Sequence, residues 1–453
     1  MATINRAPIG AQHEKIQIKL AKEDYLPNFE KSLKQAARQA NVPGFRKGMV
    51  PAGMIRKMYG QSVFADEVLR TAGAQLEDYL RQEKVNLFGQ PMAITNGEPL
   101  NLDMNQPGEV ELDFEIGVVP EFQLTALGKN LTRYKVQVTD KMLDDEVERI
   151  QRRFGKVDSV EEVTSKEDII YCTFQQTAPD GTVQEGSEKV EETILMDKLP
   201  AALQEQLMGR KAGDSLLIKP VDVATTEELP VFLKQSLKAA PEDGDKTFEM
   251  TITKVGLLHP HELNAELMAQ VFPNELMDEA TFRNRLREEL QKEFDRMAGE
   301  RLNNEIFETL VHETNITLPE AFLKRWLAEG QEQKRSLQEV EQGFGEFQHG
   351  LRWQLISDKL IQENELQVTR EDLKSHLQQQ VLQYFGMEDA DEAPWLDSYL
   401  EKMMKDDKTI NETYRRLVTE KVFNFLQTQF NISEQEVSEE EFFKAPQGHH
   451  HHH

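Results

Sequence analysis

Apolar and polar positions along the first 119 residues alternate with two different periods. The period is that of a β-strand over 16–20 and 110–118, and that of an amphipathic helix over 26–40 and 52–84. Strands before and after a pair of helices predict a small α+β domain, which we place at 1–119.

The pattern then changes twice. Residues 120–164 contain one short extended piece, near 134–138, and one charged helix, near 140–154, so we expect a connector. Residues 165–257 favour strands and predict a compact β-rich domain. The expected strands are 169–174, 192–196, 215–223 and 247–255, with a turn at Pro179-Asp180-Gly181 and a short helix at 200–208.

Most of the remaining chain has a helical pattern, and 258–443 is expected to form an extended helical body with arms. Apolar residues recur every three to five positions from Thr281 to His312, which predicts a helix roughly 45–50 Å long. Further helices are expected at 319–342, 347–364, 369–385, 394–405 and 409–430. Residues 444–453 have the pattern of a tail with a histidine purification tag.

Three expected helix starts carry a capping box, in which a hydroxyl is followed three residues later by an acid. These pairs are Thr317 and Glu320, Thr369 and Asp372, and Thr409 and Glu412. The predicted fold class is therefore α+β multidomain, with an α+β head, a β-rich middle domain and an all-α body.

Length and composition agree with several soluble domains. At roughly 100–200 residues per domain, 453 residues predict about three domains. The one cysteine, Cys172, excludes a framework of intrachain disulfides, and no apolar run reaches the roughly 18 residues of a membrane span. The N-terminal residues lack the apolar core of a signal peptide. We therefore expect a cytoplasmic protein with no membrane partner.

The net charge of −27 is divided unevenly along the chain. Residues 1–60 hold eleven Lys and Arg against four Asp and Glu, a net of +7, which leaves −34 for the remainder. The acidic remainder excludes a chain built wholly to bind nucleic acid. The basic segment predicts a polyanionic partner for the first domain. The alternative is that its cations lie on a solvent-exposed helix face that binds no partner.

Residues 41–51 combine chain-breaking residues with a small recognition set. The breakers are Pro43, Gly44, Gly48 and Pro51. Such a loop presents Phe45, Arg46 and Lys47 at an exposed tip, where the cations pair with phosphate or carboxylate and the ring fills an apolar notch. The alternative is a turn whose Phe45 folds back into the domain.

This segment resembles the ribosome-docking loop of the trigger factor family, the bacterial chaperones of nascent chains. The family pattern Gly-Phe-Arg-x-Gly-x-x-Pro is matched by Gly44, Phe45, Arg46, Gly48 and Pro51, and Lys47 is also the usual residue. The resemblance extends over essentially the whole chain, and 318–323 is similar to the Leu-Pro segment that opens an arm helix in the family. It implies a ribosome-binding head, a domain similar to FKBP-type prolyl isomerases, and a helical chaperone body.

The resemblance also implies partners. Residues 44–48 would contact a large-subunit ribosomal protein and rRNA near the exit tunnel, in binding that weakens with salt. Nascent and unfolded polypeptides would be the clients of the helical body. A homodimer of the free protein is left open.

The middle domain departs from the pattern of an active isomerase. FKBP-like isomerases need an apolar, aromatic-lined pocket for a twisted X-Pro amide, and no nucleophile, metal or cofactor. The family has an aromatic two residues after an Asp-Gly turn, where this chain has Val183. Its Ile-Pro-Gly-Phe-Glu type segment corresponds here to 199–204, which lacks the phenylalanine and the acid. A remnant pocket would consist of Tyr171, Phe174, Val183 and Leu199, but its aromatic residues fit a hydrophobic core equally well. We predict weak or absent isomerase activity.

Other candidate chemistry is sparse. His259-Pro260-His261 has a His-x-His spacing but no clear third ligand, so a solvated linker is the simpler interpretation. Cys172 lies in a predicted strand and is expected to be a buried small apolar residue. The chain has no Gly-rich phosphate loop and no Gly-x-Ser-x-Gly elbow. We therefore expect no cofactor, no metal and no use of ATP.

Three functions stay open from the sequence. The favoured one is an ATP-independent chaperone that docks on the ribosome and shields unfolded chains in an apolar-lined helical cavity. The alternative is an active peptidyl-prolyl cis-trans isomerase whose body delivers substrates, and the third is a helical assembly scaffold that acts away from ribosomes. The departures over 182–204 favour the first.

Overall fold

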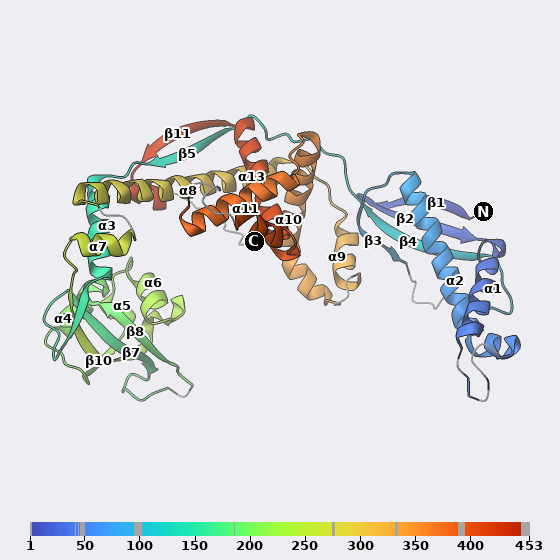
Figure 1. The fold of residues 1–453 in the computed structure, drawn as a ribbon. Helices are drawn as coiled ribbons and strands as arrows, with labels where there is room; N and C mark the ends of the chain where they lie inside the picture. The colour runs from blue at the N-terminus through green and yellow to red at the C-terminus, as the bar shows by residue number, and fades with distance from the viewer. Residues whose placement is uncertain are drawn as a thin grey trace. The chain divides into compact units, whose positions relative to one another are not determined.

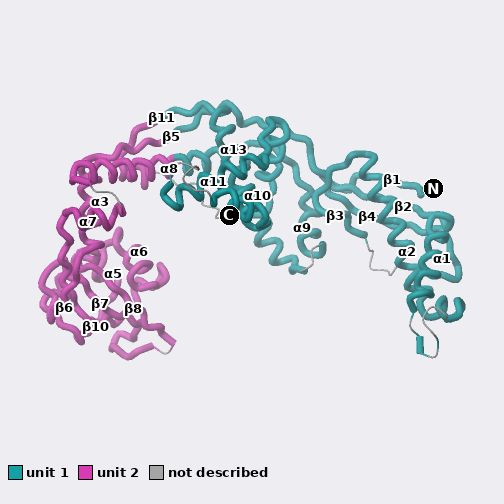
Figure 2. The backbone as a smooth tube through the Cα atoms, in the orientation of Figure 1, with its two compact units in different colours: residues 1–133, 299–434, 446–453 teal, residues 134–298, 435–445 magenta. Residues whose placement is uncertain are grey.

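The computed structural model of the chain describes residues 2–40, 42–43, 45, 50–94, 102–184, 186–273, 277–330, 334–387 and 395–444. The chain divides into two compact units (Figure 2). One contains 1–133 and 299–434, and the other contains 134–298 and 435–445. Both contain helices and strands, which confirms the predicted α+β multidomain class.

The N-terminal part of the first unit is an antiparallel sheet with two helices packed on it (Figure 1). The strand order is β1-β2-β4-β3, with bounds Thr3–Gly10 for β1, His13–Leu20 for β2, Leu87–Ala93 for β3 and Val110–Val118 for β4. The helices are α1, Lys22–Gln39, and α2, Ala52–Gln82. The predicted strands at 16–20 and 110–118 and both helices are confirmed. The alternation does not predict β1, because nearly all of its residues are exposed.

The core of this part is built on Phe64. Its ring packs edge-on against Tyr25 and Phe29, with centroids 5.4 and 5.2 Å apart, and the inward residues of β2, Ile16 and Ile18, are fully buried beside them. The two helices therefore share one apolar face with the sheet, which fixes where the loop between them leaves the domain.

The second unit contains a five-stranded antiparallel sheet. Its path is β6-β10-β7-β8, and β9 also pairs with β10. The bounds are Lys156–Val160 for β6, Asp168–Thr177 for β7, Lys189–Leu195 for β8, Ser215–Ile218 for β9 and Thr247–His259 for β10. The strand predicted at 215–223 is wrong beyond Ile218. Pro220 has no amide hydrogen for a sheet and instead begins the short helix α5, Pro220–Val223.

Helical segments fill the rest of this unit. Those beside the sheet are the 3₁₀ turn Met196–Lys198, α4 at Ala201–Leu207, α6 at Leu229–Val231, a π turn at Phe232–Ser236 and a 3₁₀ turn at Pro241–Asp245. A second group contains α3 at Asp140–Arg153, α7 at Ala265–Val271, the start of α8 at Glu279–Glu313, and α14 at Glu439–Lys444. The predicted helices at 140–154 and 281–312 are confirmed.

Two strands far apart in the sequence form a separate ribbon. β5, Asn130–Val136, pairs with β11, Asn431–Val437. The helical pattern of the C-terminal region gives no indication of β11, whose partner precedes it by about 300 residues.

The remaining helices lie in the first unit. They are α9 at Glu320–Glu329, α10 at Leu337–Glu363, α11 at Arg370–Phe385, α12 at Leu396–Met403 and α13 at Asp407–Gln429. The predicted helix at 319–342 is wrong, because α9 ends at Glu329 and α10 begins at Leu337. A capping box absent from the predicted set determines this start: Ser336 caps the amide of Glu339, and the Glu339 carboxylate accepts from the amide of Ser336.

One of the three predicted capping boxes is confirmed. The Thr369 hydroxyl accepts from the amide of Asp372 at 3.2 Å, and Asp372 accepts from the amide of Thr369 at 2.8 Å. The other two are wrong. α9 has Pro319 at its N-cap rather than Thr317, and α13 begins earlier than predicted because Asp406 caps the amide of Thr409.

α9 approaches the sheet closely at two glycines of β3 and β4. A Cβ on Gly117 would overlap the Phe322 ring, and a Cβ on Gly89 would overlap the indole of Trp326. Gly89 also has φ of +66°, a conformation that glycine adopts without strain. Substitution of either glycine would therefore displace α9.

A buried carboxylate lies at the same contact. Glu115 of β4 is 5% exposed, and its Oε2 is 2.8 Å from Nε2 of His13. Its other oxygen pairs with Arg325 of α9, which also donates to the carbonyl oxygen of Ala93 at 3.0 Å. The Arg325 guanidinium is thus paired within the contact between α9 and the sheet.

Among the described helices, none is both long enough and apolar enough to cross a membrane.

Candidate functional site

The loop between α1 and α2 contains the predicted docking residues. Gly44, Arg46, Lys47 and Gly48 lie outside the described residues, and Phe45 lies within them. The Phe45 amide donates to the carbonyl oxygen of Val42 at 3.1 Å, which closes a turn. The ring is 37% exposed, which favours an exposed tip over a phenylalanine folded into the domain.

Both ends of the loop are anchored in one apolar cluster. Val42 and Val50 are buried together with Ile55 of α2, and Leu33 and Ala37 of α1 pack against them. The described residues at both ends of the loop are therefore packed against α1 and α2.

Unpaired positive charge is concentrated on the helices that carry the loop. Five exposed cations make no ion pair with any residue that the structure describes: Lys31, Lys34, Arg38, Arg56 and Lys57. On the sheet, by contrast, Lys15 pairs with Asp113 at 2.6 Å and Lys19 with Glu111 at 2.9 Å. The ends of α1 and α2 that adjoin the loop are therefore positively charged, whereas the sheet charges are largely neutralised.

The first turns of α2 add an apolar surface that was not among the predicted site residues. Met54, Met58 and Tyr59 are all exposed. Met54 and Met58 are four residues apart, so they share one side of the helix, outside the series of buried positions that runs through Phe64 and Val68. The sequence signal for this surface is that Met54 and Met58 lie outside the apolar series that forms the buried side of α2. Exposed thioethers beside cations suit a protein and phosphate partner.

The structure does not bring the four candidate pocket residues of the middle domain together. Phe174 and Leu199 are buried in the core of the second unit, and Phe174 packs edge-on against Phe232 with centroids 6.4 Å apart. Tyr171 is an odd number of residues from Phe174 on β7, so it lies on the other face of the strand. Val183 is about half exposed.

The lone cysteine and the His-x-His pair have ordinary surroundings. Cys172 is buried as predicted, and burial, with the nearby charge of Glu192, raises the pKa of its thiol to about 12. Such a thiol carries almost no thiolate at neutral pH and is unreactive. His259 lies 3.2 Å from a carboxylate oxygen of Asp158, and a ring nitrogen of His261 lies 2.8 Å from the carbonyl oxygen of Glu262.

The body presents an aromatic surface, which we call the aromatic patch and define as Tyr384, Phe385, Trp395 and Tyr399. Their rings form a continuous series, with successive centroids 5.1, 5.0 and 5.8 Å apart. All four are exposed, and Tyr384 is 84% exposed. Beside them, a surface pocket of about 460 Å³ lies between α11, α12 and α13. A contiguous exposed aromatic surface of this kind typically binds another chain.

Charged side chains border the aromatic patch and its pocket. Glu412 and Arg416 also line the pocket, so charges of both signs border its apolar lining. Met387, Met403 and Met404 pack against the buried leucines of α11 and α12, so these methionines serve mainly as packing. The exposed surface is therefore aromatic and bordered by charge, which disfavours self-association of the patch.

Comparison with protein-family models matches the chain in three consecutive segments. A model described as bacterial trigger factor protein matches residues 3–150. A model described as the FKBP-like domain of probable trigger factor matches 157–260, and one described as the C-terminal domain of probable trigger factor matches 298–445.

Curated relatives match nearly the whole chain. Trigger factor of Salinibacter ruber is 24% identical over 437 residues, covering 92% of this chain and 90% of the relative. Trigger factor of Chlorobaculum tepidum is 25% identical over 445 residues, covering 93% and 95%. A solved structure of a trigger factor chaperone is also similar, with 17% identity and a TM-score of 0.44. Its description is "Promiscuous Substrate Recognition in Folding and Assembly Activities of the Trigger Factor Chaperone". The match covers 94% of this chain and 99% of the solved one.

Proposed function

Because the chain belongs to the trigger factor family, we propose that it is an ATP-independent chaperone that docks on the ribosome near the exit tunnel and shields nascent or unfolded chains. The observation that carries this proposal is the succession of three trigger factor segments in one chain. The proposed layout is a head at 1–119, a connector at 120–164, an FKBP-like domain at 165–257 and a chaperone body at 258–443.

Docking is assigned to the α1–α2 loop. Its proposed contacts are Gly44, Phe45, Arg46, Lys47 and Gly48, with a large-subunit protein and rRNA as their partners. The exposed Phe45 and the unpaired cations of the adjoining helices support this assignment. Because the proposed partner is the ribosome, we also propose that the protein is cytoplasmic. A homodimer of the free protein stays a prediction.

Client binding is assigned to the aromatic patch and its pocket. Unfolded chains expose apolar side chains without a fixed geometry, and aromatic rings accept many shapes through their large flat faces. Charged residues around the patch keep it soluble when no client is bound. This arrangement needs no nucleotide, because binding and release depend only on the affinity of the surface.

Replacing Tyr384, Phe385 and Tyr399 together by serine is expected to weaken suppression of client aggregation without ATP. The concentration needed for half-maximal suppression should rise by at least about tenfold, because each of the three aromatic contacts contributes about 0.5–1.5 kcal/mol and about 1.4 kcal/mol corresponds to a factor of ten. Light scattering of a chemically denatured client after dilution measures it.

The matched control replaces three scattered exposed apolar residues, Ile9, Leu69 and Val157, by serine. It removes a comparable number of exposed apolar side chains but no contiguous surface. If the control weakens suppression as much as the patch variant does, the client site is not the patch. If neither variant changes suppression, the assignment is also refuted, while ribosome docking is still measured separately.

The alternative function, an active prolyl isomerase, is tested by refolding of a protein limited by proline isomerisation. We expect acceleration at least about tenfold below that of an active FKBP-type enzyme, since about 1.4 kcal/mol of lost transition-state binding already has this effect. The reason is that Phe174 and Leu199 are buried in the core and Val183 replaces an aromatic. Acceleration close to that of the active enzyme would refute this prediction.

A further inference from the structure

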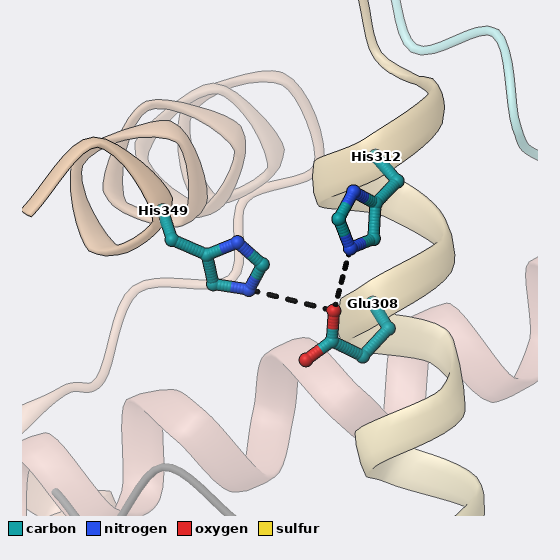
Figure 3. Close-up of side chains that lie close together, drawn as sticks. All are labelled: Glu308, His312 and His349. Carbon is teal, nitrogen blue, oxygen red and sulfur yellow. Dashed lines mark ion pairs between the residues drawn. The ribbon is translucent and has the colours of Figure 1, made fainter. Parts of the chain in front are cut away.

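We propose that Glu308, His312 and His349 form a divalent-metal site of the zinc class in the helical body (Figure 3). Glu308 and His312 are one helical turn apart, so both project from the same side of α8. His349 reaches the same point from α10. The proposal is independent of the ribosome and client assignments.

The spacing of the three ligand atoms suits a tetrahedral ion. Oε2 of Glu308 lies 3.1 Å from Nε2 of His312 and 3.5 Å from Nε2 of His349, and all the ligand atoms lie within 4.8 Å of one another. Zinc bonds of roughly 2.0–2.1 Å at tetrahedral angles place neighbouring ligand atoms about 3.3 Å apart. The two separations from Glu308 are thus close to those that one ion would impose, and the two imidazole nitrogens lie within 4.8 Å of each other.

The surroundings hold the ligands in place and leave one side open. The Phe307 ring packs against His349 at 5.1 Å and against Trp353 at 4.9 Å, which restricts rotation of the imidazole. The side chains of Glu308 and His349 are 24% and 19% exposed, whereas the His312 side chain is 69% exposed. An ion therefore has a preformed wall on one side and access from solvent on the other.

The ligand types select the class of metal. Two imidazole nitrogens and one carboxylate oxygen suit zinc, and three protein ligands leave a fourth position for water. Calcium and magnesium prefer sites built of oxygen alone, which this site does not provide. Copper would bind such a set more tightly than zinc, so the metal acquired in the cell depends on availability as well as on the site.

A bound ion would join two helices of the body. α8 and α10 each contribute to the cluster, and an ion that binds only the folded chain stabilises that chain by mass action. The expected result is a metal-dependent rise in thermal stability of the unit that contains them.

Isothermal titration with zinc chloride tests the site, on protein from which the tag histidines 449–453 have been removed. We expect one zinc ion per chain and an increase in the melting temperature. The variant with His312→Ala and His349→Ala should bind at least about 100-fold more weakly, because loss of even one residue that only orients a metal ligand costs roughly 10–100-fold, and this variant loses two ligands. Substitution with Co²⁺ adds a second readout, since a tetrahedral site gives intense visible absorption that the variant should lack.

Two further variants keep the test decisive. His312→Ala alone removes a mostly exposed side chain, so its loss of zinc binding cannot be attributed to misfolding. His259→Ala with His261→Ala is the matched control, because it removes two histidines from the other candidate spacing. The absence of zinc binding in the tag-free protein, equal binding by the His312/His349 variant, or loss of binding in the control instead would each overturn the proposal.

Discussion

Replacing Phe45, Arg46 and Lys47 together by alanine is expected to reduce ribosome binding at least tenfold. Each docking contact that buries a ring or pairs a cation contributes about 1 kcal/mol or more, and about 1.4 kcal/mol corresponds to a factor of ten. The fold should be unaffected, because the loop is anchored by Val42 and Val50. Co-sedimentation with ribosomes measures the change.

Salt dependence separates the charged side chains from the apolar one. The affinity of the wild type should fall linearly with the logarithm of salt concentration, because binding releases counterions from the phosphates. The triple variant should show a slope smaller by up to about two, at roughly 0.9 for each phosphate that it no longer neutralises. Phe45→Ala alone should weaken binding without changing the slope. These two results together would locate the docking surface at the loop.

The matched control replaces Ile9, Lys19 and Lys22 by alanine. This change also removes one exposed apolar side chain and two cations from the head. If both triple variants bind ribosomes as the wild type does, the assignment of docking to the loop is wrong. If both lose binding equally, net charge rather than the loop determines binding.

Replacing Glu115 by alanine is expected to lower the free energy of unfolding by about 3 kcal/mol. Removal of one partner of a buried ion pair leaves the other charge desolvated and uncompensated, which typically costs about 3–5 kcal/mol. We expect the lower end of this range because the Arg325 side chain is 32% exposed. His13 would also lose its carboxylate partner. Urea unfolding followed by tryptophan fluorescence measures the change, since Trp326 lies where α9 meets the sheet.

Glu111→Ala provides the control on the same strand. Glu111 pairs with Lys19 at 2.9 Å, but both side chains are substantially exposed, so we expect a loss of less than about 1 kcal/mol. Equal destabilisation by the two variants would show that the packing of α9 on the sheet does not depend on the buried carboxylate.

Local sequence was sufficient for much of the fold and for the position of the loop between α1 and α2. Helices such as α3 and α8 have a regular apolar series, and the breakers around Phe45 are adjacent in the chain. The apolar pattern over 319–364 predicts the wrong helix boundaries, because apolar positions continue on both sides of the break between α9 and α10. Only the cap at Ser336 marks the start of α10, and such short polar signals compete with many accidental matches.

Sites assembled from distant segments could not be predicted in this way. Glu308 and His312 are recognisable as a helical pair, but His349 lies beyond a helix break and joins them only through packing of α8 and α10. The expectation of no metal rested on the spacing around His259, where no third ligand follows. The exposure of Tyr384 likewise depends on which helix faces are covered, and that is a property of the whole unit.

The ribbon of β5 and β11 has a consequence for the biosynthesis of the chain itself. The Ser433 hydroxyl of β11 donates to the carbonyl oxygen of Leu131 of β5, which lies 302 positions earlier in the chain. At about 5–20 residues per second, roughly 15–60 s of synthesis separates the emergence of one strand from that of its partner. During this interval the edge of β5 lacks its partner strand and is open to pairing with other chains. The proposed task of this protein is to protect unfinished chains, and during this interval it is itself an unfinished chain. It would complete its own body only after nearly all of its residues have left the ribosome.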